Sequence, residues 1–340
     1  MMTITLSNLA AGYTDRGAEE SDLEAVVDLM NAYTQYYVGE NEASLDVIRN
    51  EWETPGFDLE FDTRLVFDPG NNLVGYVEVW TLTNPPVHPW VWWCVLPQQR
   101  GNGIGAHLLA WAEARVSTAI PRCPKGTRVA YRAGVYSVMA PAKEVMETQG
   151  LSLLRHSFTM RIKMSSPPPA PVWPEGIRLQ VYDPQHIRSA DIYRADREAF
   201  RDHFGYVEQP FDEGLEIFMH TLTGDDAHDP SLWFLAMDGK QIAGICLCRK
   251  EAYEDPECGH VDSLGVLREY RQRGIGKAFL QHAFGEYYRR GYRKVSLGVD
   301  AQNLTGALRL YEKAGMHMHQ QIDLYEKELR PGQEISVQSL

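Results

Sequence analysis

Hydrophobic positions along the chain predict helices early in each half and strands after them. Helices are expected over residues 22–38 and 44–53, and again over 184–202 and 211–222. Each pair of helices is followed by a strand, a turn and a second strand, with Asp and Gly at the turn in both cases. The same order of elements therefore occurs twice.

An apolar strand and a glycine loop come next in both halves. The strand reads WVWWCVL at 90–96 and HVDSLGVL at 260–267, and helices are expected at 103–116 and 274–290, directly after the loops. A further strand, a short helix and a last strand complete each half. Strands and helices mixed in this order predict an α/β (α+β) fold.

The two halves align as an internal repeat. At an offset of 171 residues, Val95 matches Val266, and the glycine loops fall on each other. Downstream, residues 142–151 align with 307–316, and each segment reads as a helix that ends at a glycine. Three matching blocks in one order favour a true repeat over coincidence.

A proline-rich segment separates the halves. Residues 164–176 read MSSPPPAPVWPEG, and a proline run of this kind favours an extended spacer. We therefore predict a first domain at 1–164, a linker at 165–176 and a second domain at 177–340.

Composition restricts the class of protein. Hydrophobic residues make up 44% and charged residues 23% of the 340 positions, as in a globular protein. The net charge of −13 argues against nucleic acid as a partner. No apolar run approaches the ~20 residues of a membrane span, and the N-terminus lacks a signal-peptide pattern. The five cysteines suit neither zinc nor a disulfide framework, so we expect a cytoplasmic chain without a metal.

The glycine loops do not fit two common nucleotide-binding fingerprints. Residues 101–106 match G-x-G-x-x-G/A, but the region about 20 positions further on lacks the carboxylate that would bind a ribose. In the second copy, Gln272 stands at the first glycine of that pattern. A P-loop is excluded as well, because Gly276-Lys277 is followed by Ala278 instead of Ser or Thr.

Both copies share Arg-x-x-Gly-x-Gly between an apolar strand and a helix. This pattern resembles the acyl-CoA-binding motif of the GNAT superfamily of N-acetyltransferases, and the resemblance covers nearly the whole chain as two tandem copies. It is strongest for the tandem members related to mycothiol synthase. The resemblance implies two GNAT-like domains, each a mixed, mostly antiparallel sheet flanked by helices. Backbone N–H groups at the start of a helix suit the pyrophosphate of CoA.

The resemblance implies one set of acetyl-CoA-binding residues in each half. The second-half set is Leu264, Val266, Arg271, Gln272, Arg273, Gly274, Ile275, Gly276, Lys277 and Asn303. The first-half set is Val95, Arg100, Gly101, Gly103, Ile104 and Gly105. Since both loops keep their glycines, up to two CoA sites are expected, with the tighter one in the second half.

Acyl transfer to an amine needs a base, a polarised thioester and an acid for the leaving thiolate. The resemblance assigns the acid to Tyr311 and places the base on the strand before the loop, where His260 and Asp262 share one face by alternation. The family's usual base on this strand is a glutamate, so His260 and Asp262 both stay open. The resemblance also implies a base about six residues before the last valine of this strand, which favours His260 (266 − 260 = 6). A hydrogen-bonded strand histidine and a core tyrosine are the structural alternatives.

The first half lacks these catalytic residues. The offset of 171 puts Pro89 at the position of His260 and Val91 at that of Asp262. Counting back 165 from the aligned helix puts Met146 at the position of Tyr311 and Val138 at that of Asn303. The first half therefore reads as a non-catalytic copy.

We expect a cytoplasmic N-acetyltransferase, monomeric or homodimeric, whose second half moves acetyl from acetyl-CoA directly to an amine of a small molecule or peptide. The acceptor side is expected near Asp202, His203 and Tyr206, at the end of an early helix. No nucleic-acid or membrane partner is expected. The alternatives are a CoA-binding pseudoenzyme or sensor, and an acyltransferase that uses a different acyl-CoA.

Overall fold

The computed structural model describes residues 9–253, 255–302 and 306–338. Its chain contacts form two compact units: unit 1 contains Met1–His156 and Ile322–Ile335, and unit 2 contains Ser157–Gln321 and Ser336–Leu340. Each unit has its own hydrophobic core and its own run of paired strands.

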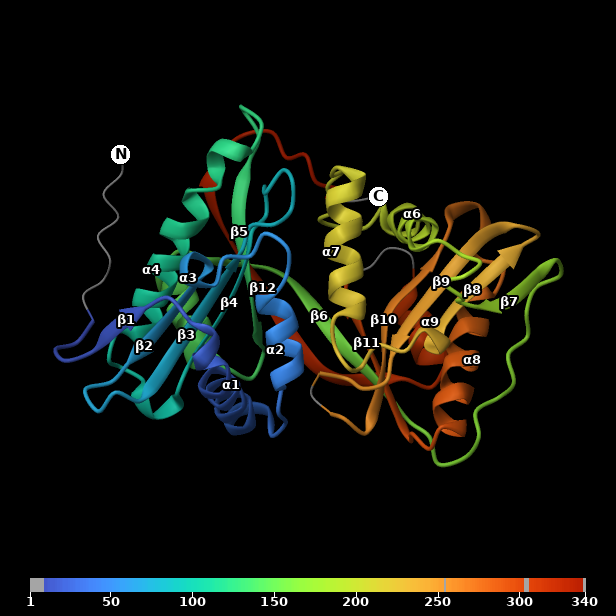
Figure 1. Ribbon diagram of the computed structural model, residues 1–340, viewed down its shortest axis with the longest axis horizontal. Helices are drawn as coiled ribbons and strands as arrows, with labels where there is room; N and C mark the ends of the chain where they lie inside the picture. The colour runs from blue at the N-terminus through green and yellow to red at the C-terminus, as the bar shows by residue number, and fades with distance from the viewer. Residues whose placement is uncertain (1–8, 254, 303–305, 339–340) are drawn as a thin grey trace. The chain divides into compact units, whose positions relative to one another are not determined.

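The first half of the chain supplies five helices and six strands within the described residues (Figure 1). These are β1 (Thr14–Arg16), α1 (Leu23–Val38), α2 (Leu45–Trp52), α3 (Leu59–Asp62), β2 (Thr63–Phe67), β3 (Leu73–Trp80), β4 (Trp90–Val95), α4 (Ile104–Ser117), β5 (Val129–Tyr136), α5 (Ala140–Thr148) and β6 (Ser152–Lys163). The periodic segments predict α1, α2 and α4 to within one residue at each end.

The second half repeats this order, without a counterpart of α3 among its described residues. Its elements are β7 (Ile177–Val181), α6 (Ser189–Phe200), α7 (Phe211–Thr223), β8 (Trp233–Asp238), β9 (Gln241–Arg249), β10 (Cys258–Val266), α8 (Ile275–Arg289), β11 (Lys294–Asp300), α9 (Ala307–Lys313) and β12 (His317–Arg330). Helix α6 begins later than the predicted residue 184, because Asp183 accepts hydrogen bonds from the backbone of Gln185 and His186 and forms a turn there.

The strands of each unit form a mixed, mostly antiparallel sheet, as predicted. The order is β1-β2-β3-β4-β5-β12 in unit 1 and β6-β11-β10-β9-β8-β7 in unit 2. The β4–β5 and β10–β11 pairs are parallel, while the other pairs whose register is resolved are antiparallel. Helices cover both faces in unit 2: a Cβ added at Gly244 would touch Phe279 of α8, and one at Gly265 would touch Ala199 of α6.

The last strand of each half completes the sheet of the other half. Strand β6, green in Figure 1, pairs with β11 in unit 2 from Ser157↔Asp300 to Lys163↔Lys294. Strand β12, red in the same view, pairs with β5 in unit 1 from Ile322↔Tyr136 onward. The units therefore differ from the domains predicted at 1–164 and 177–340, and the linker predicted at 165–176 belongs to unit 2.

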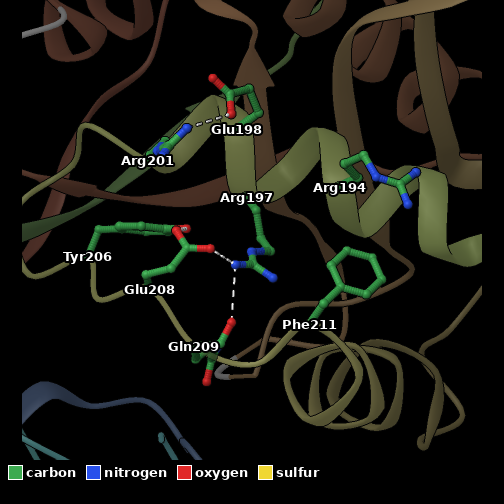
Figure 2. Close-up of a pocket in the computed structure, with 8 residues that line it drawn as sticks. All are labelled: Arg194, Arg197, Glu198, Arg201, Tyr206, Glu208, Gln209 and Phe211. Atoms are coloured by element: carbon green, nitrogen blue, oxygen red, sulfur yellow. Dashed lines mark hydrogen bonds and ion pairs between the residues drawn. The ribbon is translucent and has the colours of Figure 1, made fainter. Parts of the chain in front are cut away.

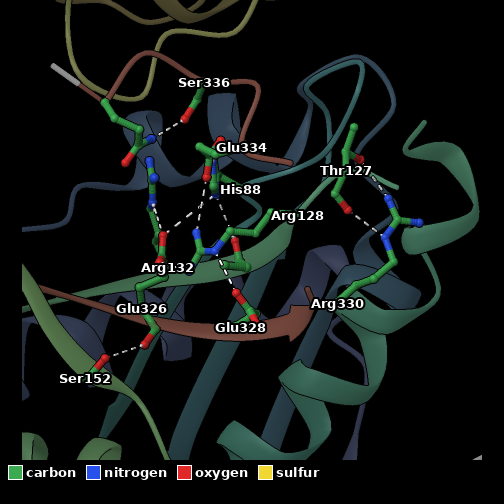
Figure 3. A network of polar contacts seen from close by, with 12 residues as sticks. His88, Thr127, Arg128, Arg132, Ser152, Glu326, Glu328, Arg330, Glu334 and Ser336 are labelled. Atoms are coloured by element: carbon green, nitrogen blue, oxygen red, sulfur yellow. Dashed lines mark hydrogen bonds and ion pairs between the residues drawn. The ribbon is translucent and has the colours of Figure 1, made fainter. Parts of the chain in front are cut away.

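A network of ion pairs fixes β12 in unit 1 (Figure 3). Glu326 of β12 is buried and accepts hydrogen bonds from Arg128 at 2.5 Å and from Arg132 at 3.1 Å. Arg128 also pairs with Glu328 and with Glu334, in the segment after the strand. Charges withdrawn from water are stable only when paired in this way, so the network specifies this position for β12.

Within the described residues, no helix is long and apolar enough to cross a membrane. The five cysteines are all buried, and none forms a disulfide. Burial was predicted for the thiols of Cys246 and Cys248, whose sulfur atoms lie 3.7 Å apart.

Candidate active site

A row of polar side chains crosses the sheet of unit 2 at His260. Ser296 on β11 lies opposite His260, and Arg249 on β9 lies opposite it on the other side. Arg161 on β6 lies opposite Ser296. Residues directly opposite each other in a sheet present their side chains to the same face. The row thus gathers two guanidinium groups, a hydroxyl and an imidazole, and its Arg161 comes from the exchanged strand.

The imidazole of His260 is held by a hydrogen bond between Nδ1 and Ser296 Oγ, at 2.9 Å. Its Nε2 lies 4.0 Å from Asp262 Oδ1. Burial lowers the pKa of His260 below its ordinary value; Asp262 opposes this shift, and Arg249 and Arg161 reinforce it. The ring is therefore neutral near pH 7, which is the form that accepts a proton.

Asp262 occupies a bulge in β10. The register passes from Val261↔Cys248 to Ser263↔Leu247, so Asp262 is an extra residue without a partner on β9. Burial raises the pKa of Asp262, although His260 and Arg249 lower it. Regular alternation would put the side chains of His260 and Asp262 on one face of the strand. The bulge breaks this alternation at Asp262, and the two side chains lie close together, as the 4.0 Å distance shows.

Strands β10 and β11 separate just beyond His260. They pair from Cys258↔Lys294 to Val261↔Leu297, whereas β10 continues to Val266 and β11 to Asp300. The backbone of β10 from Asp262 onward therefore has no β11 neighbour. This stretch contains Leu264 and Val266, both predicted to bind the cofactor.

The glycine loop after β10 has a backbone suited to an anion at the start of α8. Gln272 has a φ of 62° and Gly274 a φ of 92°, both in the left-handed region, before the helix begins at Ile275. Left-handed residues beside extended ones turn successive N–H groups toward one point. A Cβ added at Gly276 would lie 3.0 Å from Leu310 Cδ2, so any side chain here would crowd α9.

The basic residues of the loop divide into two kinds. Arg271 forms an ion pair with Asp202 at 2.5 Å and donates to the carbonyls of Ala199 and Val266. It therefore ties the loop to the end of α6 and has little capacity left for a phosphate. Arg273 and Lys277 are exposed, and they remain the candidates to contact one.

Tyr311 lies in α9 and is buried in the core of unit 2. Burial, with a smaller contribution from Cys246, raises the pKa of its hydroxyl to about 12. Its hydroxyl makes no hydrogen bond to the described part of the chain. Asn303, predicted to contact the cofactor, falls outside the described residues.

Asp196 was not anticipated from the sequence. It lies on α6 and accepts a 2.6 Å hydrogen bond from Ser263, the residue after the bulge. Burial raises the pKa of Asp196 to about 6, and the bond from Ser263 lowers it only in part. A sequence signal existed, because Asp196 interrupts the apolar face formed by Ile192, Ala195 and Ala199.

The equivalent region of unit 1 keeps the glycine loop but lacks the bulge and the residues predicted as base and acid. Gly101 and Gly103 have φ values of 84° and 75°, and Ile104 begins α4 as Ile275 begins α8. However, β4 pairs with β3 without a bulge. Val91 and Met146, which replace Asp262 and Tyr311, are fully buried core residues.

A tryptophan packs against the start of α4, beside the glycine loop of unit 1. Strands β4 and β5 also separate early, since only Trp90↔Arg132 and Val91↔Ala133 are paired. Trp93 stands at the position of Leu264 (264 − 171 = 93), and a Cβ at Gly105 would lie 3.0 Å from its ring. A cavity of about 90 Å³ remains beside Trp90, Trp92 and Trp93. Arg100 is occupied by Tyr36 and Tyr37, over whose rings it lies.

The residues expected on the acceptor side have separate roles. Asp202 is held by Arg271, which lowers the pKa of its carboxyl to about 2. His203 packs edge-on against Phe200, with ring centres 4.7 Å apart. Tyr206 lines a cavity of about 390 Å³ between α6 and α7, where Arg197 pairs with Glu208 (Figure 2). The arginines of this cavity are already paired, so it makes a weaker acceptor site than the row at His260.

Comparison with known proteins agrees with this geometry. The profile of the acetyltransferase (GNAT) family matches residues 26–125 and 190–316, more than half of the chain. A mycothiol acetyltransferase from Thermobispora bispora is 28% identical over 254 residues, which covers 74% of this chain and 78% of that protein. A second one, from Catenulispora acidiphila, is 26% identical over 259 residues, covering 75% and 77%.

Solved structures resemble the fold over nearly the whole chain. A GCN5-related N-acetyltransferase from Sphaerobacter thermophilus has a TM-score of 0.80 at 33% identity and covers 96% of this chain and 99% of its own. A tandem GNAT protein from the clavulanic acid biosynthesis pathway has a TM-score of 0.69 at 14% identity, covering 94% and 99%, which is a likeness of fold alone. The chain belongs to the GNAT family of acetyltransferases and is a tandem acyltransferase of that family.

Proposed function

We propose that unit 2 is the catalytic half and that it transfers acetyl from acetyl-CoA directly to an amine of a small molecule or peptide. Acyltransferases of this family take the acyl group from an acyl-CoA. The name of the curated relatives, mycothiol acetyltransferase, supports acetyl as that group and a small molecule as a substrate. The observation that carries the proposal is the neutral His260 beside the bulge at Asp262, where β10 separates from β11.

The glycine loop and the free edge of β10 would hold acetyl-CoA. Backbone N–H groups at the start of α8, with Arg273 and Lys277 nearby, suit the pyrophosphate. The backbone of β10 around Leu264, which β11 does not cover, suits the amide groups of pantetheine, which would then lie along the strand. The thioester would then lie near the bulge, where a backbone N–H could polarise its carbonyl oxygen.

Two side chains would move the protons. A protonated alkylamine, with a pKa near ~10, must lose a proton before it can attack, and Nε2 of the neutral His260 accepts it. The amine nitrogen then bonds to the thioester carbonyl carbon, and the C–S bond breaks. The hydroxyl of Tyr311 gives its proton to the departing thiolate, so that CoA leaves as the thiol. The acylated nitrogen then loses its second proton, which restores the hydroxyl of Tyr311. His260 releases the proton that it accepted to solvent.

In this proposal, unit 1 does not catalyse the reaction. It lacks the bulge, the base and the acid, and Trp93 fills the position of Leu264. The exchange of last strands nevertheless makes the first half of the chain essential to the site, because β6 supplies Arg161 beside Ser296.

An acetyl-CoA assay across a panel of amines tests the proposal. The panel contains aminoglycosides, polyamines, amino acids, peptide N-termini and aminosugars, and release of the CoA thiol is followed with time. We expect amine-dependent release that His260→Ala and Tyr311→Phe reduce. Binding of CoA without release by any amine would instead support a CoA-binding sensor.

A further inference from the structure

Asp196 is a carboxylate on a helix face that otherwise packs against the sheet. Its neighbours on that face, Ile192, Ala195 and Ala199, are buried, and α6 packs against β9 and β10. An ionised carboxylate among apolar groups is costly unless polar partners compensate it. Its only hydrogen bond from the described residues comes from Ser263, to Oδ1, and Oδ2 accepts none.

The other acidic residues of α6 form ion pairs with nearby arginines. Asp191 pairs with Arg188 and Arg194 at 2.9 and 2.7 Å, and Glu198 lies 3.6 Å from Arg201. These are exposed ion pairs between neighbouring turns of the helix, and they account for the surface of α6. Asp196 has no such ion pair within the described ranges, so these residues supply no cation to balance its charge.

The position of Asp196 relative to β10 indicates which cation could pair with its carboxylate. Ser263 points toward α6, whereas the next residue, Leu264, faces Gly276 at the start of α8. The thioester would lie along β10 at this point, where β11 no longer covers the strand. Asp196 therefore lies on the α6 side of β10, opposite α8, beside the stretch that β11 leaves uncovered.

We propose that Asp196, oriented by Ser263, binds the acceptor as an ammonium ion before it is deprotonated, and that the acceptor is therefore an aliphatic amine that carries a positive charge at neutral pH. This inference rests on the proposed function of unit 2. It gives Asp196 the role of a specificity residue, while proton removal stays with His260. Aromatic amines, which are uncharged at neutral pH, gain nothing from this carboxylate and are poor acceptors.

Steady-state kinetics of the full chain test the role of Asp196. For an alkylamine acceptor from the panel, Asp196→Asn should raise the KM for the amine about tenfold or more, the scale of a lost charge-assisted hydrogen bond. The KM for acetyl-CoA should stay within about twofold, and Asp196→Glu should restore part of the loss. Asp191→Asn, on the same helix, is the matched control and should change neither constant. An equal loss in both KM values, or an unchanged KM for the amine, would overturn the proposal.

Equilibrium binding separates this inference from the proposed function. Calorimetric titration of the CoA-loaded protein with benzylamine and with aniline measures affinity without turnover. We expect benzylamine to bind, aniline to bind at least tenfold more weakly, and Asp196→Asn to remove the difference. Binding of both amines with equal affinity, or of neither, would overturn the inference. If benzylamine bound through Asp196 but no amine were acetylated, the proposed function would fail while the inference stood.

Discussion

Ser296 Oγ lies 2.9 Å from Nδ1 of His260, and the two residues face each other across the parallel pair β10–β11. Ser296 is fully buried, so the hydroxyl has a fixed direction. When Nδ1–H donates to this oxygen, Nε2 holds the lone pair, as a base requires. The strand pairing that ends one residue later thus orients the ring of the proposed base and leaves the next stretch of β10 without a β11 neighbour.

Removing this hydroxyl should weaken catalysis without abolishing it. Ser296→Ala leaves His260 in place but frees its ring to rotate and to change tautomer. We expect kcat/KM for the amine to fall on the order of tenfold, the scale of one buried hydrogen bond. Ser157→Ala is the matched control, because Ser157 donates to the Val299 carbonyl on the same β11, away from His260. Equal effects of the two changes would mean that Ser296 only stabilises the strand.

The pH dependence should identify the base. Burial lowers the pKa of His260, so the neutral base is present above that lowered value and is lost as the pH falls through it. The rising limb of kcat/KM should therefore lie below ~6.5, the ordinary value for histidine.

Variants distinguish His260 from Asp262 as the base. They are needed because burial raises the pKa of Asp262, so a carboxylate base would also shift the rise of kcat/KM with pH toward the range expected for His260. His260→Ala should flatten the limb and lower kcat/KM, whereas Asp262→Asn should matter less. If Asp262→Asn abolished activity while His260→Ala kept the full pH profile, the two roles would have to be exchanged.

Tyr311→Phe should lower kcat on the order of 10²-fold, the scale of general acid catalysis. The KM for acetyl-CoA should change little, because the lost proton acts on the leaving thiolate and not on the bound thioester. Stopped-flow measurement of thiol release gives both constants. Phenylalanine preserves the packing of the buried ring, so wild-type turnover in this variant would reduce Tyr311 to a core residue.

The tighter CoA site should belong to unit 2. Gly276→Asp would put a charged side chain at the start of α8, where an added Cβ would lie 3.0 Å from Leu310. Calorimetric titration with CoA should show that this site is abolished. Gly105→Asp makes the equivalent change in unit 1, where the added Cβ meets the Trp93 ring at the same 3.0 Å. It should leave the tighter site intact. Unchanged CoA affinity in a folded Gly276→Asp variant would remove the loop from the binding site.

The network around Glu326 should contribute measurably to the stability of unit 1. Burial would raise the pKa of Glu326, but hydrogen bonds from Arg128 and the charge of Arg132 hold it below its ordinary value. Its contribution is therefore present above the ordinary pKa of glutamate and is lost as the pH falls through the lowered one.

Glu326→Gln should reduce the free energy of unfolding by about 3 kcal/mol, the scale of a broken buried pair. Glu328→Gln is the control, since Glu328 pairs with the same Arg128 but is 44% exposed and should cost less than about 1 kcal/mol. Denaturant titration at neutral pH measures both. Similar losses for the two variants would place the stabilisation elsewhere.

Local patterns in the sequence predict most of the fold and part of the site. Helix periodicity, the turn glycines and the 171-residue repeat are properties of short segments, so α1, α4 and α8 and the two glycine loops follow from them. The exchange of β6 and β12 does not, because the two halves present similar strands to similar edges. It depends on long-range ion pairs such as Arg132–Glu326, which are 194 residues apart in the chain.

The same limit applies to the candidate site. Alternation places His260 and Asp262 on one strand, but the bulge that isolates Asp262 depends on the register with β9. Arg271 fits an anion-binding motif, yet its guanidinium is taken by Asp202, 69 residues away. Ser296 and Asp196 contact β10 only through tertiary packing, so they stand out as site residues only after the strands are paired.

Detection of the acetylated product by mass spectrometry tests the central claim most directly. The full chain is incubated with acetyl-CoA and the amine panel, and each reaction is repeated with His260→Ala and Tyr311→Phe. We expect an alkylamine to gain one acetyl group, with CoA thiol released in equal amount, and both variants to form far less product. Thiol release without an acetylated amine, or undiminished product in both variants, would contradict direct acetyl transfer by unit 2.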